Sequence, residues 1–489
     1  MEYTATFDIG TTQVKGILMD EKLQVCAEAS LEIRTDYTAG QIEQEPKAWY
    51  AAFCTICQHF AACLKTDEQV TAVIMSGQMQ DTIVLDGALE AVGRAILYSD
   101  ARAGAQVETL AGLLGLADMA AVTGNLLDAS LPLAKLLWLK EEQPERYARM
   151  SKVVFSSKDY IIAQLTGQAV TDWTTAATTG LLDMQTRGWR LDWLEAAGLP
   201  PAILPQLAQA EAQVGTIHTA AAKQCGLPEG TAVYAGLGDA GAATLASGIT
   251  RPGEINIHLG TSGWVAAISQ TVLPLPSVFN LVAADTQYCI NVVPFLNAGN
   301  VHAWAARIFT GGDYGKLQTL AAESTPGAGG VCCLPYLVGE RYPVLDGQVR
   351  GSFLGVSPQT QAADLARAAL EGVAFSIRQG LESLAIAPLS ISLIGGGAQD
   401  SVWCQILADV LGQAVTVLDK SDYLPAMTLA AVVKLARGEI ADYPALLDLL
   451  RQRIGCTTYK PSPETARCYE ALYARYLRLY PALKAFYAE

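Results

Sequence analysis

Two distant segments of the chain share one pattern, in which an apolar strand ends in a glycine-threonine turn and returns as a second strand. The first has the sequence FDIGTT at 7–12 and an apolar run at 14–19. The second has a strand pattern at 254–259, the turn GTSG at 260–263 and a further strand pattern at 264–268. A pattern that occurs once in each half of a chain indicates a duplicated fold with a ligand between the halves.

The length of the chain agrees with two domains. One hydrophobic core rarely serves 489 residues, so we expect two domains of about 240 residues each. Hydrophobic residues make up 51% of the chain and charged residues 17%, which is typical of a well-packed globular protein. A segment with Gly and Pro at 248–253 marks the boundary, so the sequence predicts an α/β domain at 1–248 and another at 249–489.

The overall charge and composition exclude several classes of partner. A net charge of −15 argues against nucleic acid and anionic membranes, but not against a nucleotide, because glycine turns and helix N-termini bind phosphate. The chain starts without a basic, apolar leader, and its longest weakly polar run, 231–249, contains Asp239, so we expect no membrane segment. Eleven scattered cysteines predict reduced thiols in a cytoplasmic protein, and four dispersed histidines argue against a metal held by protein ligands alone.

One carboxylate, Asp239, lies in an almost uncharged glycine turn. A buried-strand pattern at 231–235 is followed by GLGDAG at 236–241 and by small residues at 242–248 that predict a helix. A carboxylate in this setting is costly unless it has a partner or a function. Asp239 could accept a proton from a substrate hydroxyl, or it could be the N-cap of the helix. The turn alone favours the cap, whereas the other motifs favour the base.

The turn between the first two strands contains groups that suit phosphate. Gly10, Thr11 and Thr12 can present backbone N–H groups and hydroxyls to an anion. Asp8, one strand position earlier, would face the same opening and could hold Mg²⁺ through water. The alternative is an ordinary polar hairpin, in which glycine supplies a positive φ.

Polar side chains that suit a polyhydroxylated ligand follow the strand pattern at 70–76, and a similar cluster follows the strand pattern at 94–97. Amides and carboxylates hydrogen-bond readily with sugar hydroxyls. The alternative is again a polar hairpin. The candidate residues are Gln78, Met79, Gln80 and Asp81 in the first cluster and Asp100 and Arg102 in the second.

Three glycines at 395–397 stand between a strand pattern at 390–394 and a helical pattern at 402–411. Such a turn lets a flat ring or a phosphate approach the backbone closely, although a plain tight turn would have the same sequence. Further helices are expected at 47–65, 126–142, 144–150, 160–165, 361–384 and 426–437. The segment between the helix at 160–165 and about residue 213 is expected to consist of loops.

Taken in order, these motifs resemble those of the FGGY family of carbohydrate kinases, within the actin/hexokinase/Hsp70 ATPase superfamily. The resemblance covers residues 7 to about 438. It implies two actin-like ATPase domains of the ribonuclease H-like α/β type with a cleft between them. It also implies transfer of the γ-phosphate of ATP to a terminal hydroxyl of a small sugar.

The resemblance assigns roles to individual residues. Asp239 is expected to be the catalytic base, and Asp8 is expected to position Mg²⁺, with both carboxylates near the metal. The residues expected to contact ATP are Gly10, Thr11, Thr12, Lys15, Gly260, Thr261, Ser262, Gly299, Gly396, Gly397 and Ser401. The residues expected to contact the sugar are Gln78, Met79, Gln80, Asp81, Asp100, Arg102 and Asp239.

The motifs GERxP at 339–343 and RGxF at 350–353 resemble the xylulokinase and gluconokinase branch of the family. D-xylulose is therefore the first choice of sugar, followed by D-ribulose, gluconate or a polyol, and a homodimer is plausible by family. Xylulokinases usually have histidine where this chain has Gln80, followed here by Asp81, and the segment at 426–431 lacks the usual glycine. The alternatives are a non-catalytic, nucleotide-gated sugar-binding protein and a transferase or hydrolase without a nucleotide.

Overall fold

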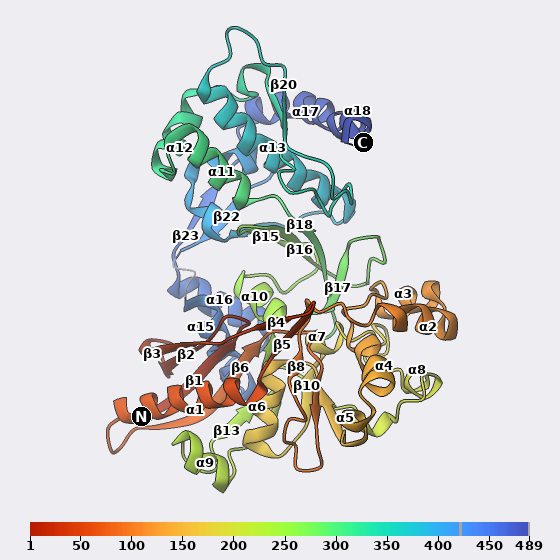
Figure 1. Ribbon diagram of the computed structural model, residues 1–489. Helices are drawn as coiled ribbons and strands as arrows, with labels where there is room; N and C mark the ends of the chain where they lie inside the picture. The colour runs from red at the N-terminus through yellow and green to blue at the C-terminus, as the bar shows by residue number, and fades with distance from the viewer. Residues whose placement is uncertain (420–422, 488–489) are drawn as a thin grey trace. The chain divides into compact units, whose positions relative to one another are not determined.

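The computed structural model describes residues 1–419 and 423–487, which divide into two compact α/β units (Figure 1). The N-terminal unit comprises Met1–Ala246, Asn280–Cys289 and Asp422–Leu450. The C-terminal unit comprises Ser247–Phe279, Ile290–Ser421 and Arg451–Glu489. The predicted boundary at 248/249 lies beside Ser247, and two segments from the second half of the sequence belong to the N-terminal unit.

The main sheet of the N-terminal unit consists of β1 (Glu2–Ile9), β2 (Gln13–Asp20), β3 (Val25–Glu32), β6 (Gln69–Gly77), β12 (Gln213–Thr216), β13 (Ala232–Tyr234) and β14 (Leu237–Gly238). The strand order is β12-β13-β6-β1-β2-β3, and β14 also pairs with β6. β1 and β2 form the predicted hairpin, and β6 runs parallel to β1. Phe7 and Ile9 point into the core, so Asp8 between them points to the opposite face of the sheet.

Helices cover both faces of this sheet. α1 (Pro46–Cys63), α6 (Ser157–Thr166) and α9 (Thr219–Cys225) share a hydrophobic core with Phe7, which confirms the predicted first helix. α15 (Leu424–Ala436) packs against β1 and β6, and α10 (Asp239–Ala246) packs against α15. Asp239 is therefore the first residue of a helix that is mostly buried.

The remaining elements of the N-terminal unit agree with the sequence expectations in part, since β8 and α5 lie in segments predicted as strand and helix. These elements are β4 (Asp36–Thr38), β5 (Gln41–Gln44), β7 (Ile83–Leu85), β8 (Ala95–Ile96), β9 (Lys152–Val154), β10 (Val170–Asp172), β11 (Gln206–Ala208), β17 (Phe279–Val282), α2 (Gly104–Leu114), α3 (Leu116–Thr123), α4 (Pro132–Glu142), α5 (Pro144–Ala148), α7 (Trp173–Ala176), α8 (Leu191–Ala196) and α16 (Tyr443–Arg453). The helix predicted at 126–142 starts only at Pro132, because Ser130 N donates to Asp128 Oδ1 (2.6 Å) in a preceding turn. The segment before residue 213 predicted as loops contains β10, α7, α8 and β11, so that prediction is wrong.

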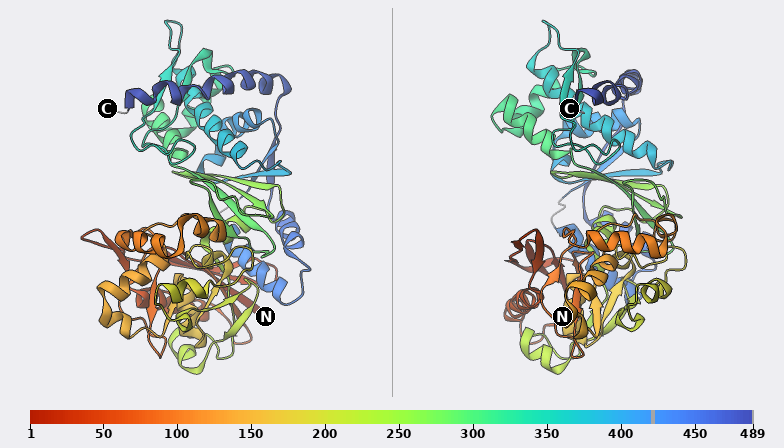
Figure 2. Two further views of the ribbon diagram at one scale, coloured as in Figure 1. Left: turned by 90° about the vertical axis from the view of Figure 1, so that its right-hand side faces the viewer. Right: turned by 45° about the vertical axis from the view of Figure 1, so that its right-hand side comes forward.

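The C-terminal unit contains a sheet in which β18-β16-β15-β21-β22-β23 follow one another. Helices α11, α12 and α13 lie over one face of it (Figures 1 and 2). The elements are β15 (Glu254–Leu259), β16 (Gly263–Ser269), β18 (Cys289–Phe295), β19 (Cys332–Leu334), β20 (Ser352–Leu354), β21 (Ser390–Ile394), β22 (Val415–Leu418), β23 (Cys456–Tyr459), α11 (Gly299–Thr310), α12 (Tyr314–Glu323), α13 (Ala362–Ser383), α14 (Ser401–Leu411), α17 (Pro463–Tyr476) and α18 (Leu479–Leu483).

The two units repeat one local arrangement, as the duplicated sequence pattern predicts. In each unit a tight hairpin joins two antiparallel strands, β1 with β2 and β15 with β16. The first strand of each hairpin pairs in parallel with a later strand, which is β6, ending at Gly77, or β21, followed directly by Gly395. Each unit therefore brings a hydroxyl-bearing turn and a glycine turn to one edge of its sheet.

Two observations bear on the class of protein. Across residues 1–419 and 423–487, no helix combines the length and apolarity needed to cross a bilayer. All eleven cysteines lie in the described part of the chain and are free thiols, as predicted.

Candidate active site

The candidate catalytic carboxylates, Asp8 and Asp239, lie at the ends of β1 and β14, the two strands that flank the end of β6. The register places Asp8 of β1 beside Ser76 of β6, and Leu237 of β14 on the other side of Ser76. Ser76 Oγ donates to Asp8 Oδ1 (2.8 Å). Asp239 follows two residues after Leu237, so parallel pairing brings both carboxylates to the same edge of the sheet.

Glycines at 236, 238 and 241 allow the turn around Asp239 to pack closely. A methyl group at Gly236, whose φ is +66°, would lie 1.9 Å from the backbone oxygen of Met75. A methyl at Gly238 would lie 2.0 Å from Met79 Sδ, and one at Gly241 would lie 2.9 Å from the side chain of Thr174. A side chain at any of these three positions would clash with neighbouring atoms, so the close packing of the turn requires the glycines.

Asp239 does not have the geometry of an N-cap. It is already the first helical residue, and its Oδ1 accepts from the adjacent Ala240 N–H (2.7 Å). An N-cap carboxylate would accept from the second or third residue of the helix. This geometry favours the alternative, a carboxylate left available for chemistry.

The surroundings of Asp239 hold its pKa close to neutrality. Its side chain is exposed, yet enough protein surrounds it to disfavour the charged form. This desolvation, followed by repulsion from Asp8, raises the pKa of Asp239 to about 7, although the Ala240 N–H opposes the shift. Asp8 is also exposed, and desolvation raises its pKa against the opposing effects of Ser76 and Lys15.

The glycine-threonine turn of the N-terminal unit is fixed from one side and open on the other. Thr11 Oγ1 donates to Gln78 Oε1 (2.7 Å), and Gln78 Nε2 donates to Gln44 Oε1 (3.0 Å). Gln44 Nε2 in turn donates to the Thr11 carbonyl (2.6 Å), while Thr12 remains exposed. Lys15 lies opposite Asp8 in the hairpin, with its ammonium 5.3 Å from the ring centre of Tyr423.

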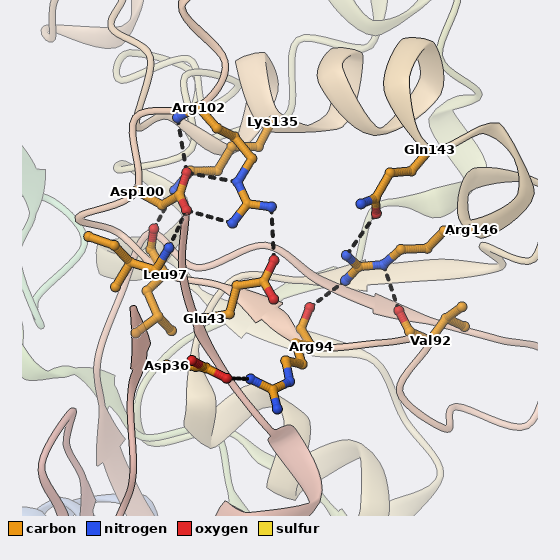
Figure 3. Close-up of polar contacts among 11 residues, drawn as sticks. Asp36, Glu43, Val92, Arg94, Leu97, Asp100, Arg102, Lys135, Gln143 and Arg146 are labelled. Carbon is orange, nitrogen blue, oxygen red and sulfur yellow. Dashed lines mark hydrogen bonds and ion pairs between the residues drawn. The ribbon is translucent and has the colours of Figure 1, made fainter. Parts of the chain in front are cut away.

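The structure does not support direct sugar contacts by Asp81 and Asp100, both of which are 0% exposed. Asp100 accepts from Ile42 N (2.6 Å) and from Arg102 Nε and NH2 (2.9 and 2.6 Å), and Arg102 also pairs with Glu43 (2.8 Å), as Figure 3 shows. These bonds use both oxygens of Asp100 to fix the loop. The sequence shows that Asp100 follows a strand pattern, but it does not show that the side chain is fully buried.

Asp81 and Lys135 form a second buried polar group in this region. Burial raises the pKa of Asp81 well above its usual range, although the positive charge of Lys135 opposes the shift. Burial lowers the pKa of Lys135 to about 8, and its ammonium donates to the Leu97 carbonyl (2.7 Å; Figure 3). The only sequence signal for Lys135 is a lone charge within the apolar run PLAKLLWL at 132–139.

Met79, Gln78 and Gln80 contribute differently to the predicted sugar cluster. Met79 is nearly buried and packs on Gly238, one residue before Asp239. Gln78 is buried and accepts from Thr11 Oγ1 of the glycine-threonine turn. Gln80 is half-buried, has a φ of +65° and donates through Nε2 to Ser130 Oγ (2.7 Å). Of these three side chains, Gln80 is the most open to a ligand.

The C-terminal unit contains a cavity of about 640 Å³. Five predicted ATP-contacting residues line it, together with residues that the sequence did not single out. The predicted lining residues are Gly260, Thr261, Gly299, Gly396 and Gly397; the others that matter here are Asn300, His302, Tyr314, Gln318, Gln399 and Asp400. Ser262 and Ser401 are not among its lining residues, and Ser401 Oγ accepts from Gln318 Nε2 (2.5 Å).

Close backbone approaches build this cavity. Gly299 N donates to the Gly260 carbonyl (2.7 Å), and a methyl at Gly299 would lie 2.3 Å from that oxygen. Gly395 has a φ of +97°, and a methyl there would lie 2.6 Å from the backbone oxygen of Leu259. The glycines let β15, α11 and the turn after β21 meet without intervening side chains.

A histidine–aspartate pair forms part of the cavity wall. His302 Nε2 lies 3.0 Å from Asp400 Oδ2, and both side chains are nearly buried. Asp400 Oδ1 accepts from Val402 N and Trp403 N (3.0 Å each), so Asp400 is the N-cap of α14. These partners are 98 residues apart, and no local pattern at His302 indicates the pairing.

Exposed strand-end carboxylates, a hydroxyl-bearing turn and a glycine-lined cavity are together typical of a phosphotransferase that uses a general base. Comparison with known proteins identifies the group. The family model for the N-terminal domain of the FGGY family of carbohydrate kinases matches residues 3–246, and the model for the C-terminal domain matches residues 255–431. The chain belongs to the FGGY family of carbohydrate kinases.

Individual relatives agree with this placement. The xylulose kinase of Lactococcus lactis is 31% identical over 84% of this chain and 83% of its own, and that of Escherichia coli is 30% identical over 97% and 98%. The crystal structure of xylulose kinase from Rhodospirillum rubrum has a TM-score of 0.90 at 28% identity and covers all of both chains. That of gluconate kinase from Lactobacillus acidophilus has a TM-score of 0.87 at 28% identity, covering 99% of each chain.

These comparisons confirm three predictions made from the sequence. The family is the one that the ordered motifs resemble, the fold is a two-domain α/β fold, and the protein is a sugar kinase and thus a phosphotransferase.

Proposed function

We propose that this kinase phosphorylates a terminal hydroxyl of D-xylulose, with Asp239 as the general base. The accessible Asp239 carboxylate carries the proposal, because a base must reach the substrate and works best with a pKa near the working pH. The names of the relatives support the choice of D-xylulose.

The cavity of the C-terminal unit is assigned to the adenosine of ATP. Its volume of about 640 Å³ lies in the usual range for small-molecule sites. The glycines at 260, 299, 396 and 397 give ring and phosphate groups access to the backbone. The phosphates are assigned to the two turns, through Gly10, Thr11, Thr12 and Lys15 in one unit and Gly260 and Thr261 in the other.

Mg²⁺ is assigned to Asp8 and Asp239. Asp8 and Asp239 are exposed carboxylates that repel one another. A divalent cation bound to oxygen atoms of both would reduce this repulsion. The described residues contain no group of three or more His, Cys, Asp or Glu side chains arranged for a metal. At kinase sites, phosphates and water usually complete the ligand set of Mg²⁺. When bound, Mg²⁺ would neutralise phosphate charge.

Within this scheme the chain aligns the substrates. Asp239 accepts the proton of the sugar hydroxyl, the two turns orient the phosphates through N–H and O–H donors, and Gln80 contacts the sugar. No covalent intermediate is required, because phosphoryl transfer depends mainly on alignment and charge stabilisation. Cytoplasmic location and a homodimer complete the proposal, supported by the free cysteines and by family resemblance.

Gln80 favours a second candidate, a kinase for D-ribulose, gluconate or a polyol. An amide that is already bonded to Ser130 replaces the imidazole expected in xylulokinases, so the hydrogen-bonding pattern offered to the sugar differs. The gluconate kinase among the structural relatives agrees with this alternative.

The test measures ADP formation from MgATP with D-xylulose, D-ribulose, gluconate and erythritol. We expect one sugar to stimulate turnover strongly. Asp239→Asn should lower kcat by about 10²–10⁴-fold, whereas Asp192→Asn, which alters an exposed ion pair with Arg190, should not. Stimulation by another sugar would replace D-xylulose. Near-normal turnover of Asp239→Asn would exclude the proposed base, and binding without ADP formation would favour the binding protein.

A further inference from the structure

A buried ionic cluster in the N-terminal unit has no role in the scheme above. Lys158 Nζ lies 2.6 Å from Asp159 Oδ1 and 2.9 Å from Asp172 Oδ1, and all three side chains are 0–1% exposed. One ammonium thus accompanies two carboxylates, leaving an excess negative charge in the interior. Such a cluster is expensive to bury, and well-packed apolar residues would often be at least as stable.

The start of α6, which carries Lys158 and Asp159, contacts the backbone next to both candidate catalytic carboxylates. Ser157 Oγ, adjacent to Lys158, donates to the carbonyl of Ile9 (2.7 Å), the residue after Asp8. A methyl group at Gly77 would lie 2.9 Å from Lys158 N. Since Gly77 pairs with both Ile9 and Gly238, the start of α6 supports the strand ends that present Asp8 and Asp239.

Asp172 connects the cluster to Asp239 through α7. It is the N-cap of α7, because its Oδ2 accepts from Thr175 N (3.2 Å), and its Oδ1 accepts from Thr175 Oγ1 (2.6 Å). Thr175 Oγ1 would lie only 2.9 Å from a methyl at Gly238, so α7 packs directly on the residue before Asp239. A displacement of α7 would therefore move the base.

Asp159 provides an internal comparison, since it shares the burial and the lysine but not this connection. Its second oxygen accepts from Thr171 Oγ1 (2.7 Å), which is in β10 rather than in α7.

We propose that Asp172, held by Lys158, is a positioning residue for the base Asp239, because through Thr175 it fixes α7 against Gly238. The proposal rests on the proposed function, in which Asp239 is the base.

The test compares Asp172→Ala with Asp159→Ala in the full-length chain, with kcat and KM measured well below the thermal midpoint. Both variants remove one carboxylate from Lys158 and should lower the thermal midpoint. Only Asp172→Ala also removes the bonds to Thr175. Only this variant should therefore lower kcat, by about tenfold, because small displacements of a catalytic group are costly.

A second pair of variants tests the same contact without altering any charge. Thr175→Val removes the hydroxyl bond to Asp172 and should lower kcat about tenfold, because small displacements of a catalytic group are costly. Thr175→Ser restores the hydroxyl and should restore kcat.

Equal values of kcat in Asp172→Ala and Asp159→Ala would overturn the proposal. If Asp172→Ala did not fold, Thr175→Val would decide, since an unchanged kcat there would also overturn it. Asp239→Asn distinguishes this failure from failure of the proposed function: if Asp239→Asn is inactive while Asp172→Ala and Asp159→Ala have the same kcat, only the positioning role is lost.

Discussion

Gly396 and Gly397 are adjacent in the turn after β21 and form a matched pair for locating the nucleotide. A methyl at Gly397 would lie 2.7 Å from Trp403 Cζ3 and 2.8 Å from Leu259 Cβ, and both side chains are fully buried. A methyl at Gly396 would meet no heavy atom of the described protein within 4 Å, and Gly396 does not have a positive φ. Both residues line the cavity, so only their packing differs.

This difference predicts opposite phenotypes for the two alanine variants. Gly397→Ala should lower the free energy of unfolding by about 1–3 kcal/mol, the usual cost of overpacking a core. Gly396→Ala should change it by no more than about 1 kcal/mol, with a gain expected from the stiffer unfolded chain. Its methyl instead takes space in the cavity and should raise KM for ATP about tenfold, equivalent to about 1.4 kcal/mol.

The assay combines thermal unfolding without nucleotide and ATP titrations at saturating sugar. Gly396→Ala should unfold at or slightly above the wild-type midpoint, with a raised KM for ATP and an unchanged KM for sugar. A wild-type KM for ATP in this variant would refute the assignment of adenosine to the cavity. A loss of stability as large as that of Gly397→Ala would refute the packing difference itself.

Three further predictions concern the N-terminal unit. Because Asp239 must lose its proton to act as a base and its pKa is raised to about 7, kcat/KM should rise with pH through that value and fall about tenfold for each pH unit below it; a flat profile from pH 5.5 to 8.5 would contradict this. Asp8→Asn removes repulsion from Asp239, so the acid limb should move to lower pH while the Mg²⁺ concentration for half-maximal activity rises; unchanged Mg²⁺ titrations would argue against the metal role. Arg102→Met should lower the free energy of unfolding by about 3–5 kcal/mol, because it leaves the buried Asp100 carboxylate without its ion pair (Figure 3). Arg94→Met, which breaks an exposed pair with Asp36, should lower it by less than about 1 kcal/mol. Equal losses of the two variants in denaturant unfolding would contradict this distinction.

The parts of the fold that could be predicted are those with strong local patterns. β15 and β21 match their predicted bounds, and the hairpin at 7–18 forms as expected, because apolar alternation and glycine turns act over a few residues. The glycines at 236, 238 and 241 could be singled out because their spacing around one carboxylate is unusual. Short elements such as α7 and β10 could not, since four or fewer residues carry too weak a pattern.

The parts of the site that could not be predicted depend on long-range partners. Asp100 resembles a binding residue in sequence, but it is sealed by Arg102 and by Ile42, which is 58 residues away. His302 and Asp400 are 98 residues apart, so their pairing exists only after the C-terminal unit folds. Burial and pairing at this range are set by tertiary packing, which local sequence does not encode.

Five aspartates of the N-terminal unit show that tertiary packing gives identical side chains different exposure and different charged neighbours. Asp81, Asp100 and Asp172 are buried, and a lysine or arginine lies near or against each, so their charge states and positions are fixed by the protein. Asp8 and Asp239 are exposed at strand ends and repel one another. Of these five aspartates, only Asp8 and Asp239 are open to a substrate or a cation. Exposure, rather than residue type, therefore distinguishes the two carboxylates that we propose for catalysis from the three buried ones.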